Sequence, residues 1–224
     1  MRKHEIEALL FDLDGTLIDS IPIWIDANVR MLREFGYAMD SETFLRDYYQ
    51  KGLHFKGILE KCGLDLSLGD AFYPKRDDLY IELLGENVAW IGNAGEVLAK
   101  CAAKIPLGLM TGSKRSFIDA LEPKLRLSHI FKAIITYDDT GDRMKPDPYG
   151  LLLLTKKLGV DPAECLYIGD QTVDPIAARN AGMKSCLIPF RETPKGAEEE
   201  ADYVIASLGD LLKPDAPFRF SVSS

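Results

Sequence analysis

The sequence is poor in the side chains that most often build zinc and redox sites. It has four cysteines and three histidines in 224 residues. The cysteines stand far apart, at Cys62, Cys101, Cys165 and Cys186. They form no C-x-x-C pair, so neither a zinc motif nor a redox motif is indicated. The histidines, His4, His54 and His129, show no ligand spacing. Because Cys165 and Cys186 lie in apolar runs, we expect them to be small buried hydrophobic residues.

Long apolar segments and a targeting signal are also lacking. No run of about 18 apolar residues is present, so no membrane span is expected. The first residues, Met1-Arg2-Lys3-His4-Glu5, lead into an apolar segment without the core of a signal peptide. We therefore expect a cytoplasmic protein.

An excess of positive charge is missing as well. The formal net charge is −8, which argues against broad electrostatic binding to nucleic acid or to an anionic membrane. A phosphate substrate would need a local positive site, such as a metal ion, a lysine or a helix N-terminus. Hydrophobic residues make up 46% of the chain, enough for a substantial core. This length suits one large domain or a core with a smaller insert.

The most informative segment is Leu9-Leu10-Phe11-Asp12-Leu13-Asp14-Gly15-Thr16-Leu17. An apolar strand ends in two carboxylates one residue apart. Alternation along an extended chain places Asp12 and Asp14 on the same side, so both can face one metal ion or one substrate. A surface turn is the alternative, since Asp and Gly favour turns. A calcium loop is not, because Leu17 and Ile23 occupy the positions that need Gly and Glu.

The chain after this segment divides into a helical part and an alternating part. Between about residues 19 and 88 the pattern predicts helices without an intervening strand. Their expected extents are Pro22 to Phe35, Asp40 or Ser41 to about Tyr49, Leu53 to Cys62, and Pro74 to Leu84. Because this helical stretch follows the first strand, we expect an inserted cap domain over residues 19–88. Residues 1–18 and 89–224 would form the core domain.

Strands and helices alternate from Asn93 onward. A capping box at Asn93 and Glu96 predicts a helix to about Lys104, and Ser113 is expected to cap another through Leu121. A further helix is expected from Asp147 to Gly159, and another is expected to follow the strand at residues 165–169 and to run to Ala181. Strands are expected at residues 6–12, 105–111, 132–136, 165–169, 184–188 and 203–205, with a loose tail after Pro214. This alternation predicts an α/β fold, a Rossmann-like parallel sheet with helices on both faces.

Three further segments place polar residues at strand ends. Thr111-Gly112-Ser113 offers hydroxyls and backbone amides suited to a phosphate group. Lys145, before Pro146, could steady phosphoryl charge or a carboxylate, or could be a solvated loop residue. Asp170 follows an apolar strand and Asp174 lies one helical turn later, an oxygen-ligand pair suited to magnesium. A helix cap would also explain Asp170.

Together these segments resemble the four motifs of the haloacid dehalogenase-like (HAD) superfamily of phosphotransferases, over about residues 6–190. The resemblance implies the phosphoglycolate phosphatase and β-phosphoglucomutase branch, with a helical cap. It implies Asp12 as nucleophile and Asp14 as general acid and base. Thr111, Gly112, Ser113 and Lys145 would bind the phosphoryl group, with Thr111 and Lys145 also catalytic. Mg²⁺ would be held by Asp12, the backbone carbonyl of Asp14, Asp170 and Asp174.

The acid at position 14 narrows the reaction that the resemblance implies. Dehalogenases and phosphonate-cleaving relatives lack it, so phosphate-ester hydrolysis or phosphomutase chemistry is expected. We predict a magnesium-dependent hydrolase of a small phosphorylated metabolite, acting through an aspartyl-phosphate as a monomer or homodimer. The alternative is a sugar-phosphate mutase of the β-phosphoglucomutase type. Five residues of the expected cap match no mutase signature and are interpreted mainly as solvated charges: Arg46, Lys51, His54, Lys56 and Arg76.

A third hypothesis is a binding or regulatory protein on an inactive enzyme fold. Such proteins usually lose the nucleophile, the acid or the lysine. All three are present here as Asp12, Asp14 and Lys145. The sequence therefore favours an enzyme, and magnesium-dependent hydrolysis of a generic aryl phosphate would separate the two classes.

Overall fold

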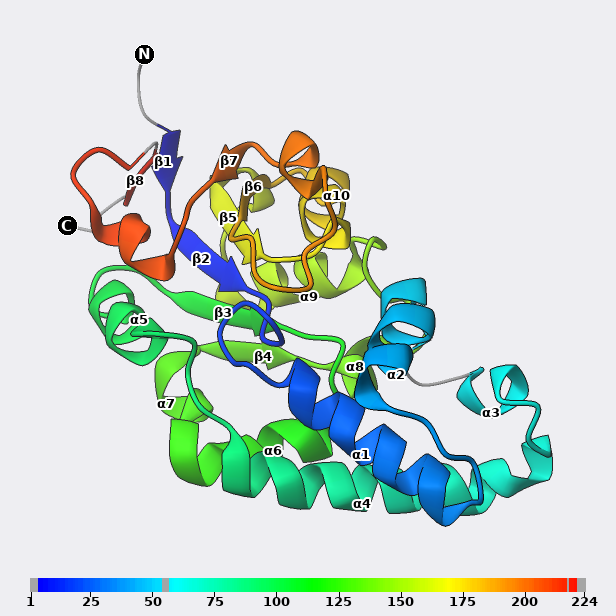
Figure 1. The fold of residues 1–224 in the computed structure, drawn as a ribbon. Helices are drawn as coiled ribbons and strands as arrows, with labels where there is room; N and C mark the ends of the chain where they lie inside the picture. Colours follow the sequence, from blue (N-terminus) through cyan, green and yellow to red (C-terminus); the bar gives the residue numbers. More distant parts are fainter. Residues whose placement is uncertain (1–3, 54–56, 217, 221–224) are drawn as a thin grey trace. The chain divides into compact units, whose positions relative to one another are not determined.

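The computed structural model describes residues 4–53, 57–216 and 218–220 (Figure 1). The chain divides into two compact units, Met1–Asp19 with Ala89–Ser224, and Ser20–Val88. His54 and Lys56, named above as cap residues, lie outside the described residues.

The larger unit is built on a six-stranded parallel sheet in the order β4-β3-β2-β5-β6-β7. Its strands are β2 (Ala8–Phe11), β3 (Leu107–Met110), β4 (Ala133–Ile135), β5 (Cys165–Gly169), β6 (Lys184–Leu187) and β7 (Tyr203–Val204). The chain runs outward from β2 in one direction through β3 and β4, and in the other through β5, β6 and β7. The sheet thus has a topological switch point between β2 and β5, where open α/β sheets place their ligands.

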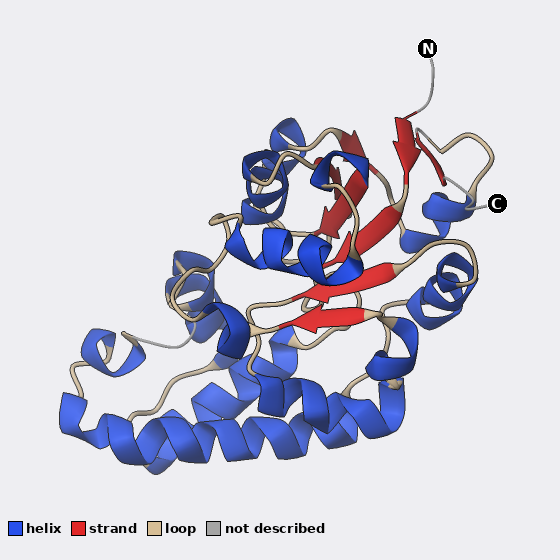
Figure 2. Ribbon diagram, turned by 180° about the vertical axis from the view of Figure 1, so that it is seen from behind, coloured by secondary structure: helices blue, strands red, loops and turns tan. Residues whose placement is uncertain are grey.

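Helices cover both faces of this sheet, as Figures 1 and 2 show. Side chains alternate between the faces, so Leu10 packs in a cluster with Leu151 of α9 and Ala177 of α10, while the Phe11 ring contacts Phe131. The helices of this unit are α5 (Ala94–Ala102), α6 (Arg115–Leu125), α7 (Leu127–Ile130), α8 (Tyr137–Thr140), α9 (Tyr149–Leu158), α10 (Val173–Asn180) and the 3-10 helices η3 (Pro162–Glu164), η4 (Ala197–Glu200) and η5 (Leu208–Leu212). The predicted α/β class is confirmed.

The smaller unit is helical throughout its described residues. It consists of α1 (Ile21–Glu34), α2 (Ser41–Asp47), η1 (Tyr49–Lys51), α3 (Ile58–Lys61), η2 (Leu66–Leu68) and α4 (Gly69–Asn87). Asp40 caps α2 by accepting a hydrogen bond from the backbone N–H of Thr43 at 2.8 Å, as predicted. Phe44 and Phe72 are fully buried in its own apolar cluster, which gives this unit a core of its own.

Two helices of the smaller unit begin at positions that the sequence did not indicate. Of the helix predicted from Leu53 to Cys62, the structure has α3, which begins after Gly57 at φ +82°. Leu53 itself is not helical, and residues 54–56 lie outside the described residues. Conversely, α4 begins at Gly69 and contains Pro74, which was expected to open it. Gly85, expected to end that helix, lies within it.

Two predicted helix caps in the larger unit are wrong. Asn93 precedes α5, but its side chain accepts no capping bond from the described residues, and the N–H of Glu96 donates to its backbone carbonyl instead. Ser113 does not cap α6, whose N-cap is Lys114. The Ser113 hydroxyl donates to Asp14, so a site interaction replaces the capping bond.

The C-terminal tail is more ordered than predicted. Residues expected to fray include β8 (Phe218–Phe220), which pairs in parallel with β1 (His4–Ile6) in a second, two-stranded sheet. The strand at Tyr203 is therefore not the last one. The predicted first strand is likewise divided, because β1 ends at Ile6 and β2 starts at Ala8.

The remaining compositional expectations concern cysteines and membrane spans. Cys101, Cys165 and Cys186 are buried and unpaired, and Cys62 is half-buried. Burial raises the pKa of Cys165 and of Cys186 to about 12, as expected for cysteines that act as apolar residues. None of the helices in the described parts of the chain has the length and apolarity to cross a bilayer.

Candidate active site

The sequence-predicted site residues follow three adjacent strands at the switch point. Asp12 directly follows β2, Asp170 follows β5 and Thr111 follows β3. Since β2 pairs with both β3 and β5, the parallel register brings these three positions to one edge of the sheet. All three side chains are buried, with Asp12 5% exposed and the other two fully enclosed. Buried polar groups at strand ends are typical of a site rather than of a core.

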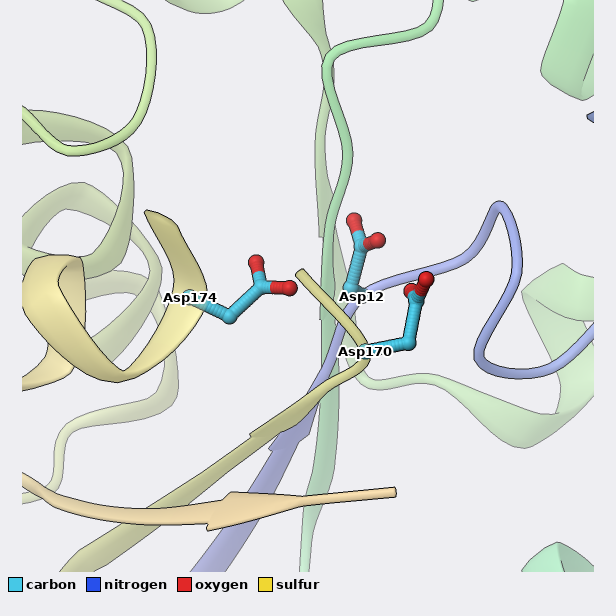
Figure 3. Close-up of side chains that lie close together, drawn as sticks. All are labelled: Asp12, Asp170 and Asp174. Carbon is cyan, nitrogen blue, oxygen red and sulfur yellow. The ribbon is translucent and has the colours of Figure 1, made fainter. Parts of the chain in front are cut away.

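Three carboxylates converge at this edge. Oxygens of Asp12, Asp170 and Asp174 lie within 4.8 Å of one another, and all three residues are buried. Figure 3 shows the Asp12 and Asp170 side chains just after the ends of two neighbouring strands and Asp174 at the beginning of α10, with its carboxylate turned toward them. Hard cations prefer such oxygen ligands, so this cluster has the chemistry of a site for a hard metal ion.

Lys145 joins two of these carboxylates. Its Nζ donates to Asp12 Oδ1 at 2.8 Å and to Asp174 Oδ1 at 2.7 Å. A third bond, at 3.1 Å, goes to the hydroxyl of Tyr167. The side chain is 12% exposed, so these are buried, charge-assisted interactions. The interpretation of Lys145 as a solvated loop residue is therefore wrong.

Asp14 lies beside the carboxylate cluster and makes a separate network. Its Oδ2 accepts hydrogen bonds from Thr111 Oγ1 at 3.1 Å and from Ser113 Oγ at 2.9 Å. The backbone N–H of Ser113 donates to Thr111 Oγ1 at 3.0 Å, with Gly112 between them in the chain. The two hydroxyls thereby orient the Asp14 carboxylate. Its backbone carbonyl remains a predicted metal ligand.

Asp170 is held by residues to which sequence reasoning gave no role. Thr16 Oγ1 donates to its Oδ1 at 2.8 Å, and Gln171 Nε2 to its Oδ2 at 2.5 Å. Thr193 Oγ1 donates to its backbone carbonyl at 2.7 Å. Thr16 belongs to the Asp-Gly-Thr segment, and Gln171 is next to Asp170 in the sequence. Their closeness in sequence to the predicted site residues could have indicated a role for both. Thr193 lies in a charged loop that gave none.

Two glycines make room for the carboxylates. At Gly15, with φ +82°, a Cβ would stand 2.6 Å from Asp170 Oδ2. At Gly169 it would stand 2.3 Å from Asp174 Oδ2. Both distances are shorter than any ordinary contact, so side chains at these positions would displace the carboxylates. The glycines therefore belong to the construction of the cluster.

The electrostatics of the cluster favour a cation. Burial raises the pKa of Asp12 well above its usual range, against the effect of Lys145. Burial and then the charge of Asp174 raise the pKa of Asp170 to about 7. Burial alone would lower the pKa of Lys145, but Asp12 and Asp174 outweigh it and raise that pKa. The group contains three carboxylates for one ammonium, an imbalance that a divalent cation would correct.

The residues present therefore fit a metal ion in their donor chemistry. The carboxylates of Asp12, Asp170 and Asp174 supply oxygen ligands, and Thr16 and Gln171 fix one of them from outside. Such outer hydrogen bonds orient the ligands of metal sites.

The charged residues predicted for the cap differ in their surroundings where the structure describes them. Arg46 is exposed and ion-paired with Asp47 at 2.8 Å, and Lys51 is exposed, as predicted. The expectation of a solvated charge is wrong for Arg76, which is 1% exposed. Its Nη1 donates to Asn28 Oδ1 at 3.1 Å, and its guanidinium lies 4.3 Å from the ring centroid of Trp24. Arg76 is thus part of the core of the helical unit.

Comparison with known proteins gives a consistent result. The family model for haloacid dehalogenase-like hydrolases matches residues 9–188. The chain is 31% identical over 222 residues to the pyrophosphatase PpaX of Bacillus velezensis, covering 95% of this chain and 97% of that protein. It is 28% identical over 212 residues to phosphoglycolate phosphatase 1 of Pseudomonas aeruginosa, covering 91% and 78%.

Solved structures share the same fold. The crystal structure of CbbY from Rhodobacter sphaeroides in complex with phosphate matches with a TM-score of 0.78 at 22% identity. The match covers 92% of this chain and 96% of that one. The resemblance inferred from the sequence motifs is therefore confirmed.

Proposed function

The chain belongs to the haloacid dehalogenase-like hydrolase family and is a phosphoric monoester hydrolase, and we propose that it cleaves a small phosphorylated metabolite in a magnesium-dependent reaction with Asp12 as nucleophile. The observation that carries this proposal is the convergence of Asp12, Asp170 and Asp174 around Lys145 at the switch point of the sheet. Phosphoryl transfer requires mainly positioning and charge neutralisation, and this group of residues is suited to both.

In the first half-reaction an Asp12 carboxylate oxygen attacks phosphorus. A bond from that oxygen to phosphorus forms while the bond from phosphorus to the leaving oxygen breaks, and Asp14 gives its proton to the leaving oxygen. In the second half-reaction Asp14 takes a proton from water, whose oxygen attacks phosphorus and releases Asp12 and phosphate. The hydrogen bonds that Asp14 accepts from Thr111 and Ser113 hold its carboxylate in place before substrate binds.

The phosphoryl group would be held by the turn after β3. The hydroxyls of Thr111 and Ser113 and the backbone N–H of Gly112 are close together in the chain. Each hydroxyl has one proton, which it gives to Asp14 before substrate binds and would turn to a phosphoryl oxygen afterwards. Lys145 would place its ammonium against Asp12 while negative charge is transferred. Magnesium, when held by Asp12, Asp170, Asp174 and the Asp14 carbonyl, would neutralise charge on the carboxylates and the phosphoryl group.

We also propose that the helical unit Ser20–Val88 is the cap that selects the substrate. Its support is its place in the chain, because it is inserted a few residues after Asp14, in the segment that leaves the carboxyl end of β2. An insert at that position can exclude water from a reaction and choose among esters.

The relatives suggest two substrate classes. One is named a phosphoglycolate phosphatase and supports a small carboxylate or sugar phosphomonoester. The other is named a pyrophosphatase, and its identity of 31% over 97% of its length makes pyrophosphate a second candidate. Both classes use the same nucleophile and differ only in the leaving group.

A substrate panel tests the proposal. Purified protein would be given phosphoglycolate, several sugar phosphates, pyrophosphate and an aryl phosphate, with magnesium or with a chelator, and phosphate release would be measured. We expect release that needs magnesium and is fastest for one small substrate. Isomerisation of a sugar phosphate without net phosphate release would instead identify the mutase, and inactivity on the whole panel would reject an enzyme with this site.

The metal assignment has a test of its own. Asp170→Asn should shift the magnesium concentration for half-maximal activity upward by about tenfold or more, because one charged ligand is lost. Asp161→Asn is the matched control, since Asp161 caps the remote η3. An unchanged titration for Asp170→Asn would remove Asp170 from the ligand set.

A further inference from the structure

Tyr167 lies on β5 with its hydroxyl against the site. The residue is 1% exposed, and its ring packs in the apolar cluster beneath the sheet edge. The hydroxyl oxygen accepts from Lys145 Nζ at 3.1 Å. Its proton faces Asp174 Oδ1 at 3.3 Å and the carbonyl of Met110 at 3.4 Å. A buried tyrosine hydroxyl needs a hydrogen-bond partner, and here two of its partners, Lys145 and Asp174, are charged residues of the site.

The hydroxyl completes the coordination of Lys145. An ammonium group has three N–H donors, and here they meet Asp12 Oδ1, Asp174 Oδ1 and Tyr167 Oη. The two carboxylates hold the ammonium at two points, and the hydroxyl supplies the third point that fixes its position. A donor left without an acceptor in this buried place would favour rotation of the group toward water.

We propose that Tyr167 is a positioning residue that keeps Lys145 on Asp12 during turnover. The proposal rests on the function proposed above. When Asp12 becomes an acyl phosphate it loses its carboxylate charge, and its bond from Lys145 weakens. Asp174 and Tyr167 keep their positions through this step, so they hold the ammonium beside Asp12 until water has attacked. The effect of Tyr167 therefore falls on the rate of the chemical steps and not on substrate binding.

Tyr167→Phe isolates the hydroxyl. The phenylalanine ring fills the same space in the apolar cluster and keeps the ring face, 5.7 Å from Lys145 Nζ. Tyr203→Phe is the matched control in the same unit, because Tyr203 packs against Phe218 at the far edge strand. Both variants would be assayed for kcat, KM and thermal unfolding on the best substrate of the panel.

We expect kcat of Tyr167→Phe to fall about tenfold, the loss of one hydrogen bond to a charged group, with KM within about twofold of the parent. Tyr203→Phe should keep both constants. In a Lys145→Met background, Tyr167→Phe should have no further effect on the residual rate, because its action passes through the lysine.

Four results would overturn the assignment. They are an unchanged kcat, a change confined to KM, an equal loss of kcat in the Lys145→Met background, and a loss of activity that only follows unfolding. The last would be recognised because activity returns on cooling as the folded fraction of the variant rises. Failure of the proposed function looks different, because then the unaltered protein itself releases no phosphate from any member of the panel.

Discussion

Among the described residues, the helical unit encloses the cation Arg76 and the α/β unit encloses the cation Lys145, and the charges around the two are balanced differently. Arg76 in the helical unit has one carboxylate partner, Asp77 at 2.8 Å, together with the Asn28 amide and the Trp24 ring. Burial lowers the pKa of Arg76, and the Asp77 charge opposes this. Charge is therefore matched within α4, and the contacts with Asn28 and Trp24 join Arg76 to α1.

Lys145 in the α/β unit is surrounded by excess negative charge. It contacts Asp12 and Asp174, and Asp170 stands beside them. The structure tolerates an arrangement that costs stability, which natural proteins do mainly at functional sites. A buried cation thus indicates a structural role when the surrounding negative charge balances it, and a binding site when negative charge is in excess.

The largest effect should come from removing the nucleophile. Asp12→Asn is expected to lower kcat by at least about 10⁴-fold, because an amide cannot form the acyl phosphate. In metal-free protein it should also raise the unfolding temperature, since one member of the crowded carboxylate group becomes neutral. Phosphate release and thermal unfolding in chelator would be measured together, and retained turnover would exclude Asp12 as nucleophile.

Removing the cation of the site should be the next largest effect. Lys145→Met is expected to reduce kcat by about 10²–10³-fold, because charge on Asp12 and on the phosphoryl group is no longer neutralised. Lys157→Met serves as the control, since this exposed lysine lies 3.8 Å from Asp139 on the surface. Equal activities for the two variants, measured by phosphate release, would contradict the role of Lys145.

Arg76, the cation whose charge is balanced, should affect stability more than activity. Arg76→Met is expected to lower the free energy of unfolding by about 3 kcal/mol, because Asp77 and Asn28 lose a buried partner. Its kcat, measured well below the unfolding transition, should change far less than that of Lys145→Met. Denaturant unfolding would be compared with that of Arg30→Met, whose exposed ion pair with Asp26 contributes little.

The smallest expected effect is on stability and concerns the surface ion pair of Asp202 with Lys184. Burial raises the pKa of Asp202, but hydrogen bonds from Lys184 and Ser185 outweigh it and lower that pKa below 3.8. A lowered folded-state pKa gives stability that is present above the unfolded pKa and is lost as pH falls through the folded one. Asp202→Asn should therefore cost less than about 1 kcal/mol near neutral pH, and the cost should shrink in acid. Urea unfolding of the parent and the variant, near neutral pH and in acid, would measure this difference in stability. A difference that grows in acid would refute the prediction.

Most of the fold could be predicted because local pattern and tertiary position agree. Consecutive strand residues such as Leu9 and Leu10, which point to opposite faces, are both apolar and buried, as a parallel sheet covered on both faces requires. Helix ends were less predictable, because tertiary contacts displaced local ones. Ser113 has the side chain of a helix cap, but its hydroxyl bonds to Asp14 from 99 residues away in the chain.

The polar ends of strands could be predicted, but the residues that support them could not. Asp12 and Asp170 stand out as acids after apolar runs. Tyr167 does not, because tyrosine is common in strands and its hydroxyl partners are far away in sequence. Arg76 was misjudged for a related reason, since one charged letter on a helix gives no sign of the Trp24 ring that covers it.

The residues of the site also link activity to the order of folding. Lys145 is 133 residues from Asp12, and Thr16 is 154 residues from Asp170, so both contacts close very long loops. They need the pairing of β2 with β5, the most distant in the six-stranded sheet. Contacts of this range form late compared with helices. During refolding, regained turnover should therefore lag behind regained helix signal, and enzymatic rate becomes a probe of the final closure of the chain.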